Sequence, residues 1–468
     1  MEKFVLQSFK KLYDEVSSME QTGGFFGFLE KNVMGPLGKV SQYKIVRGIM
    51  GAGVATIPFT IVGSLFLVFD IIPVAFPALS GFFDSAFAPF SALYMTAFSA
   101  SMGVLGLYFC LALAYNYTKI IADEEELKLD ALNGALLALF AFLMSLPHFF
   151  IEDGIFVNSE AGWERLGTAG VFTAIILSIL AVQIYRICIK YNWTIKMPEE
   201  VPEGVARSFT ALIPAAVVAF VIIILNGIMI ALGTNLFDIV AWPFGFARYL
   251  TDSVLGIIVI YFLIHALWIV GIHGANVIGP LVGPIALNNL GYNMDRMQAI
   301  ADGYAGASEM PFFVWADGFQ AAYVVAGGSG ATMGLLIYML FMAKSKQLKI
   351  LGKASAGSSI FNINEPIIFG VPMIYNPMMA IPFFMAPIIS AVVATLAIQL
   401  QIIPPIVATF PWPTPMVLNA FIGSGGSIMA ALVSFLSIVI SFVVYLPFAR
   451  AYDKKLVAEE QENAAAAA

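Results

Sequence analysis

Long hydrophobic stretches that contain no Asp, Glu, Lys or Arg recur along the whole chain. Each stretch is long enough to cross a hydrocarbon layer of about 30 Å, because an α-helix rises about 1.5 Å per residue. The pattern predicts an all-α polytopic membrane protein. The nine stretches cover approximately residues 48–69, 90–118, 131–147, 168–185, 209–233, 255–272, 322–343, 376–400 and 427–447.

Basic residues in the short loops predict how these helices are oriented. Lys39, Lys44 and Arg47 precede the first stretch, whereas the loop from Asp70 to Asp84 contains no Lys or Arg. Loops rich in Lys and Arg stay in the cytoplasm, so we expect the N-terminus on that side.

The number of crossings follows from the second half of the chain. Basic clusters at Lys344–Lys353 and Arg450–Lys455 are also expected in the cytoplasm, which places both termini on the same side. Termini on one side require an even number of crossings. We therefore expect a tenth helix within about residues 274–320, where Gly and Pro interrupt the hydrophobic pattern.

Composition narrows the possible functions. Of the 468 residues, 60% are hydrophobic and 11% are charged, whereas an ordinary soluble domain has roughly a quarter charged residues. The mean hydropathy is +0.88. The net charge of −7 argues against nucleic-acid binding, and two cysteines with three scattered histidines predict neither a disulfide framework nor a metal site. We expect no cofactor.

The two ends of the chain have different patterns. Val5, Phe9, Leu12 and Val16 recur at helical spacing, which predicts an amphipathic helix on the cytoplasmic membrane surface or, as an alternative, on a partner protein. The chain closes with Glu-Gln-Glu-Asn and five alanines. We expect this tail to be disordered or artificial.

Glu365 is the most informative acid, in the sequence Ile360-Phe-Asn-Ile-Asn-Glu-Pro-Ile-Ile-Phe-Gly370. It is the only acid between Asp317 and Asp453. A carboxylate within a membrane is costly unless it lines a cavity, so a functional role is favoured. The Pro and Gly of this segment predict a re-entrant hairpin entered from the cytoplasm. The alternative is a structural carboxylate bonded to neighbouring backbone amides.

Polar residues within an apolar region are here called a polar island, and the segment around Glu365 is the first. The second polar island contains His265-Ala-Leu-Trp268 and Gly271-Ile-His273-Gly-Ala-Asn276. His273 stands between glycines, where a helix can break and expose backbone groups, so it is the better site candidate. For His265 a structural role is equally favoured, because helices in lipid use hydrogen bonds from such side chains to backbone carbonyls.

A third island is Ala408-Thr-Phe-Pro-Trp412-Pro-Thr-Pro-Met416. Its alternate prolines exclude a regular helix, so we expect Trp412 on irregular backbone beside a cavity. An indole face suits the C–H face of a sugar ring, although a tryptophan of the membrane interface is the alternative. Glycine runs at 327–332 and 423–426 indicate either backbone amides that bind an anion or close helix packing.

Together these segments resemble a known family. The segments are Asn362-Ile-Asn-Glu365-Pro, Trp268 with Gly271-Ile-His273-Gly, the Gly-Gly-Ser-Gly-Ala-Thr run and Pro411-Trp412-Pro-Thr-Pro415. They are similar to the enzyme IIC component of the bacterial phosphotransferase system, lactose/cellobiose/diacetylchitobiose family. The similarity extends from about residue 30 to residue 450, and the Asn-Ile-Asn-Glu-Pro segment is its most specific part.

The resemblance implies a homodimer in the bacterial plasma membrane, in contact with lipid, with ten membrane helices and two re-entrant hairpins per chain. The chain would then contain four parts, namely a cytoplasmic amphipathic segment over 1–47, a dimerisation domain over 48–250, a sugar-binding and transport domain over 251–450 and a cytoplasmic tail over 451–468.

The resemblance also implies an activity. The protein would bind a β-linked disaccharide and move it across the membrane, and a phosphocysteine of enzyme IIB would phosphorylate the sugar. Enzyme IIA would supply the phosphate to enzyme IIB. No Cys follows residue 450, so we expect the phosphoryl donor on a separate polypeptide and this chain to be the membrane subunit of a phosphotransferase complex. Glu365 and His273 would lie near the sugar hydroxyl that accepts phosphate, and Trp412 would stack on a sugar ring. Further candidate sugar-binding residues are Asn362, Asn364, Trp268, Asn276, Gly328 and Ser329.

The chemistry of these residues supports the same function. A sugar hydroxyl that attacks phosphorus needs a group that accepts its proton and holds it in place, and a carboxylate with an imidazole can do both. The alternative hypothesis is an ion-coupled secondary sugar transporter in which Glu365 is a proton or sodium site.

Overall fold

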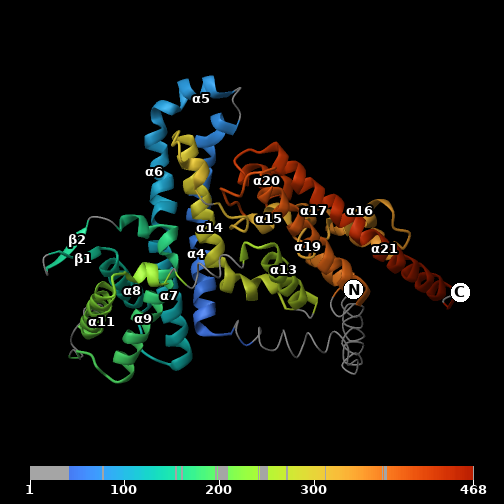
Figure 1. Ribbon diagram of the computed structural model, residues 1–468. Coiled ribbons are helices and arrows are strands. Elements are labelled where there is room, and N and C mark those ends of the chain that lie inside the picture. Colours follow the sequence, from blue (N-terminus) through green and yellow to red (C-terminus); the bar gives the residue numbers. More distant parts are fainter. Residues whose placement is uncertain are drawn as a thin grey trace.

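The computed structural model describes most of the chain (Figure 1). The described residues are 39, 42–75, 79–152, 155–159, 162–195, 198, 209–240, 242, 251–269, 272–310, 312–371, 373 and 377–466. The amphipathic helix expected near the N-terminus therefore lies outside the described residues.

The first half is a group of helices around α7. Its α-helices are α4 (Lys44–Ala75), α5 (Ser80–Ala86), α6 (Ser91–Ser101), α7 (Leu105–Glu125), α8 (Ala131–Ser145), α9 (Val171–Lys190) and α11 (Leu212–Ala231). Short 3₁₀ turns are η3 (Ala88–Phe90), η4 (Met102–Val104), η5 (Trp163–Leu166) and η6 (Thr168–Gly170). Helices α4, α8 and α9 all pack on α7, whose Phe109, Leu113 and Tyr117 are buried.

An ion-pair network joins three of these helices at one end. Glu125 of α7 accepts hydrogen bonds from Lys44 of α4 and from Arg186 of α9, each at 2.7 Å. Arg47 pairs with the neighbouring Glu124. These residues flank the apolar spans, so the charges satisfy one another where the helices leave the hydrophobic layer.

The second half contains one long helix packed on the first half and a bundle of shorter segments. Its elements are α13 (Val254–Ile269), α14 (Gly274–Ala301), η7 (Ala307–Glu309), α15 (Phe319–Tyr323), α16 (Met333–Phe341), α17 (Lys346–Ile360), α18 (Glu365–Gly370), α19 (Pro377–Gln399), α20 (Met416–Gly423) and α21 (Ile428–Ala466). Figure 1 shows α14 alongside α4, where the two halves meet. Helix α21 packs on α16 and α19.

The helical membrane fold is confirmed. Six helical segments within the described residues are long and apolar enough to cross a membrane, and two shorter apolar helices, Ala131–Ser145 and Val254–Ile269, accompany them. In the interval 274–320, where a tenth crossing is expected, the chain forms α14, whose 28 residues span about 42 Å. This helix contains Pro280 and Pro284 together with several polar residues, which hides it from a hydropathy profile. Helix α14 is not among the six apolar spans, so the count of ten crossings stays a prediction.

The expected span over 322–343 is wrong as a single helix. The chain forms α15, turns through the glycine run and then forms α16, which has only nine residues. Gly327, Gly328 and Gly330 have positive φ angles, a backbone conformation that interrupts a right-handed helix. Apolar composition alone does not show this break.

The all-α class holds, and the described residues also include one small hairpin. In it β1 (His148–Glu152) and β2 (Ile155–Ser159) form an antiparallel pair. Their aromatic and β-branched residues flank an Asp-Gly pair in the sequence, which favours a tight hairpin. The C-terminal tail is not disordered, because α21 continues to Ala466.

The extension of α21 holds the start of α17. Asp453 is buried and accepts hydrogen bonds from the backbone N–H of Ser345 (2.8 Å), the backbone N–H of Lys344 (2.8 Å) and the hydroxyl of Tyr338 (3.0 Å). Glu460 accepts from two further backbone N–H groups at the first turn of α17. The free N–H groups of this helix start are thus satisfied by carboxylates of a distant segment.

We expect Asp453→Ala to destabilise the protein by about 2 to 4 kcal/mol, because it leaves buried donors without an acceptor. The midpoint of thermal unfolding in detergent should fall clearly. Glu459→Ala removes an exposed acid from the same helix and should leave the midpoint nearly unchanged. Equal midpoints for the two variants would contradict the role of Asp453.

Candidate functional site

The site is organised by the turn between α17 and α18. Asn362 adopts a left-handed conformation with φ of 62°, which reverses the chain after α17. The carbonyl of Asn364 accepts from the backbone N–H groups of Ile367 and Ile368, and Glu365 is the first residue of α18. The segment forms a helix–turn–helix hairpin, and its re-entrance into the membrane from the cytoplasm stays a prediction.

The amide side chains of this turn link two other loops to it. The Asn364 Nδ2 donates to the carbonyl of Ser329 (2.6 Å) and to the hydroxyl of Thr332 (2.7 Å). The Asn362 Nδ2 donates to the carbonyls of Trp412 (2.8 Å) and Thr414 (3.0 Å). Both asparagines are buried. The glycine loop and the Pro-Trp loop therefore meet at one turn, although they are far apart in the sequence.

Gly328 is required by this convergence. Its φ is 109°, and an added Cβ would lie 2.4 Å from Asn364 Cγ and 2.7 Å from the Asn362 carbonyl oxygen. The glycine thus permits the close approach of the 327–332 loop to the turn. Ser329 contributes its carbonyl to the same contact.

Glu365 is half-buried and faces the second polar island. Its Oε2 is buried and has no hydrogen-bond partner among the described residues. The alternative of an amide-bonded structural carboxylate stays open. Glu365 and His273 are near enough for the carboxylate to act electrostatically on the imidazole.

His273 caps the N-terminus of α14. Its Nδ1 accepts from the backbone N–H of Asn276 at 3.4 Å. Its ring lies 4.6 Å from the Trp268 ring, centroid to centroid, with an angle of 50° between the planes. Trp268 is buried, and its Nε1–H has no partner among the described residues. A donor, Trp268 Nε1–H, and an acceptor, Glu365 Oε2, thus both lack a partner among the described residues near His273.

His265 has the structural role. Its Nδ1 lies 2.6 Å from the carbonyl oxygen of Tyr261, one helical turn earlier, and its ring packs edge-on against Phe383. The side chain is fully buried. These contacts agree with the structural alternative for His265.

Trp412 lies on irregular backbone, as its prolines predict. The backbone from 404 to 411 has no regular secondary structure, and α20 begins only at Met416. Asn362 holds the Trp412 carbonyl, while 57% of the residue is exposed. The backbone of Trp412 is therefore held in place, while its indole ring is accessible.

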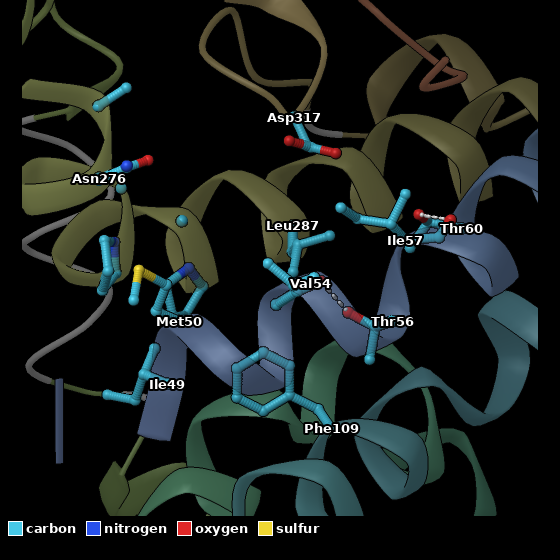
Figure 2. Close-up of a pocket in the computed structure, with 16 residues that line it drawn as sticks. Ile49, Met50, Val54, Thr56, Ile57, Thr60, Phe109, Asn276, Leu287 and Asp317 are labelled. Atoms are coloured by element: carbon cyan, nitrogen blue, oxygen red, sulfur yellow. Dashed lines mark hydrogen bonds between the residues drawn. The ribbon is translucent and has the colours of Figure 1, made fainter. Parts of the chain in front are cut away.

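A cavity of about 250 Å³ lies between α4 and α14 (Figure 2). Asn276, on the first turn of α14, lines it together with apolar residues of α4 and with Phe109. Asp317 faces the cavity from the other end. The cavity thus starts at the helical turn that His273 caps and runs along the contact between the two halves.

Asp317 is a candidate that the sequence analysis did not select. Its carboxylate is bonded to Thr409 and to the backbone of Gly318, and its N–H donates to the Ala286 carbonyl at 3.0 Å. Thr409 belongs to the third polar island. The sequence does contain a feature that indicates Asp317: this acid borders a long uncharged stretch, just as Glu365 lies within one.

Metal binding has no candidate among the described residues, because no three His, Cys, Asp or Glu side chains are grouped in them as metal ligands would be. The polar groups of the site are instead amides, the carboxylates of Glu365 and Asp317, an imidazole and indoles. Such a mixture is typical of the recognition of a neutral molecule with many hydroxyls.

Comparison with known proteins assigns the family. The sequence model described as "Phosphotransferase system, EIIC" matches residues 50–387. The chain belongs to this EIIC family. This assignment confirms the resemblance found in the sequence and places the protein among the sugar permeases of the membrane.

The relatives are similar over nearly their whole length. The chain is 32% identical to the lichenan permease IIC component of Bacillus subtilis (strain 168), covering 93% of this chain and 95% of that protein. It is 33% identical to the cellobiose-specific EIIC component of Geobacillus stearothermophilus, covering 94% and 96%. The crystal structure of ChbC, the IIC component of the N,N'-diacetylchitobiose-specific system, matches with a TM-score of 0.82 at 33% identity, covering 93% and 99%.

We expect Gly328→Ala to abolish measurable sugar binding, because the new Cβ would displace the Asn364 side chain. Gly357→Ala is the matched control. Gly357 lies in α17, and an added Cβ there would meet nothing within 4 Å, so this variant should bind as the unchanged protein does. Binding can be measured by equilibrium dialysis with labelled cellobiose, lactose and diacetylchitobiose. Normal binding by Gly328→Ala would show that the contact between loop and turn is dispensable.

Proposed function

We propose that this EIIC protein takes up a β-linked disaccharide of the cellobiose, diacetylchitobiose or lactose class and presents one sugar hydroxyl for phosphorylation. The observation that carries the proposal is the convergence of three distant loops beside Glu365, whose buried Oε2 has no hydrogen-bond partner among the described residues. The names of the relatives, which refer to cellobiose, lichenan and diacetylchitobiose, support the substrate class.

Glu365 accepts the proton of the reacting hydroxyl or orients that hydroxyl, and His273 is its polar partner. Phosphoryl transfer depends mainly on positioning and on the stabilisation of charge. A carboxylate with a free oxygen can hold the hydroxyl, while the imidazole, fixed by its cap and by Trp268, can share the proton.

The rest of the sugar is held by the surrounding residues. Trp412 stacks on one ring, and the indole N–H of Trp268 donates to a hydroxyl. Asn362 and Asn364 act chiefly by holding the loops of Ser329 and Trp412, since their Nδ2 groups are already bonded to protein. Gly328 allows the approach, and Asn276 with Asp317 extends the polar surface along the cavity.

The phosphoryl donor is a phosphocysteine of an enzyme IIB partner, which receives its phosphate through enzyme IIA. Relatives named lactose-specific EIICB components support such a pairing of C and B functions. The protein works as a homodimer in the bacterial plasma membrane. Residues 48–250 supply the interface, and residues 251–450 bind and carry the sugar.

The proposal is tested by uptake into membrane vesicles that contain the protein, with and without a phosphorylated IIB partner. We expect sugar phosphate inside the vesicles only when the donor is present. Glu365→Gln should reduce phosphorylation by at least about 100-fold, because it removes the proton acceptor, while sugar binding is retained. Glu309→Gln changes an exposed acid and should behave as the unchanged protein.

Two results would contradict this assignment. Uptake of unmodified sugar driven by an ion gradient, without a phosphoryl donor, would favour the secondary transporter. Undiminished phosphorylation by Glu365→Gln would remove the role proposed for the carboxylate.

We expect Asp317→Asn to weaken sugar binding about tenfold, because a carboxylate accepts hydrogen bonds from sugar hydroxyls more strongly than an amide does. Asp295→Asn makes the same change at an exposed position of α14 and should not alter affinity. Titration calorimetry on the purified variants measures both. If the two variants bind equally well, Asp317 serves only to hold Thr409.

A further inference from the structure

A second cavity, of about 300 Å³, lies away from the sugar site. It is formed by the end of α14, the end of α19 and the loop at 402–407. Most of its wall is aliphatic, and it contains one charged residue, Arg296. None of the candidate sugar-binding residues lines it.

The position of α19 places this cavity near the membrane surface. One of the six apolar spans covers Met378–Gln399. Ile398, from the last turn of that span, and Gln401, just beyond it, both line the cavity. Polar headgroups lie where an apolar span ends. The cavity is therefore level with the lipid phosphate groups and with the part of the acyl chains next to the headgroup.

Arg296 is incompletely satisfied in this setting. Its Nη2 donates to the Ser308 carbonyl at 3.2 Å, and its guanidinium carbon lies 4.7 Å from the centre of the Phe312 ring. Its Nε is buried and has no hydrogen-bond partner among the described residues. A buried donor without an acceptor is unfavourable, most of all on a charged group.

We propose that this cavity binds an anionic phospholipid. The headgroup phosphate accepts a hydrogen bond from Arg296, because the planar guanidinium suits phosphate oxygens. The start of an acyl chain packs on Met297, Ile300 and Ile402.

The composition of the wall favours a lipid over a sugar. Besides Arg296, the polar side chains are Gln401 and Asn293, and the Asn293 Nδ2 already donates to the carbonyls of Phe313 and Ile406. A sugar would need several free hydrogen-bonding groups around its ring. The aliphatic wall offers few of them.

The same asparagine connects the lipid cavity to the sugar site. Phe313 precedes Asp317, which lines the first cavity, and Ile406 precedes Thr409, which is bonded to the Asp317 carboxylate. A bound lipid therefore supports the two segments that lead to this pair.

The test is the thermal unfolding of delipidated protein in neutral detergent, titrated with phosphatidylglycerol. A ligand that binds the folded state raises the unfolding midpoint with its concentration. We expect Arg296→Gln to need about ten times more phosphatidylglycerol than the unchanged protein for the same rise. Arg450→Gln, an exposed arginine in the basic cluster of α21, should respond as the unchanged protein does.

A second variant keeps the test valid if Arg296→Gln does not fold. Ile300→Trp fills the cavity from an exposed position without a change of charge, and it should lose the response to phosphatidylglycerol to a similar extent. The proposal is supported if at least one folded variant shows this loss and Arg450→Gln does not.

Four results would overturn the proposal: an unchanged response of both cavity variants, an equal loss in Arg450→Gln, an equal response of the unchanged protein to phosphatidylcholine, or full replacement of the lipid by inorganic phosphate. A rise with cellobiose that Arg296→Gln abolishes would instead make the cavity a sugar site. None of these outcomes depends on phosphorylation of the sugar, so they are distinguishable from a failure of the proposed function.

Discussion

The structure depends on the satisfaction of polar backbone groups inside a membrane protein. Irregular backbone at this depth is stable only when its carbonyl and N–H groups find partners within the protein. Asn362 and Asn364 supply those partners for the glycine loop and the Pro-Trp loop. The hydrogen bonds that stabilise the broken segments are therefore the same ones that bring the site residues together.

The contact between α4 and α14 has a comparable dual role. The two halves meet there, yet the contact is incomplete and leaves the cavity that Asp317 and Asn276 line. Gly279 and Gly283 face open space, since an added Cβ at either position would meet no atom within 4 Å. Small residues on α14 thus keep room between helices that otherwise pack closely.

Much of the site was accessible to sequence reasoning. Glu365, His273 and Trp412 were selected because a carboxylate, an imidazole and a proline-bound indole are expensive or unusual inside an apolar chain. Asp317 obeys the same rule but is less conspicuous, because it stands at the border of its uncharged stretch. The functions of Asn362 and Asn364 as links between loops could not be seen, since their partners lie 32 to 52 residues away in the sequence.

The sequence by itself determined the membrane fold class, the family and the residue types at the site, because hydropathy, helix breakers and rare polar groups are local properties. Tertiary structure decided which of those segments meet. The span expected at 322–343 forms two short helices. His265 is hydrogen-bonded to a backbone carbonyl, and the C-terminal helix caps the start of α17. Each of these outcomes rests on a hydrogen bond or a close approach between distant segments, and no local pattern encodes that geometry.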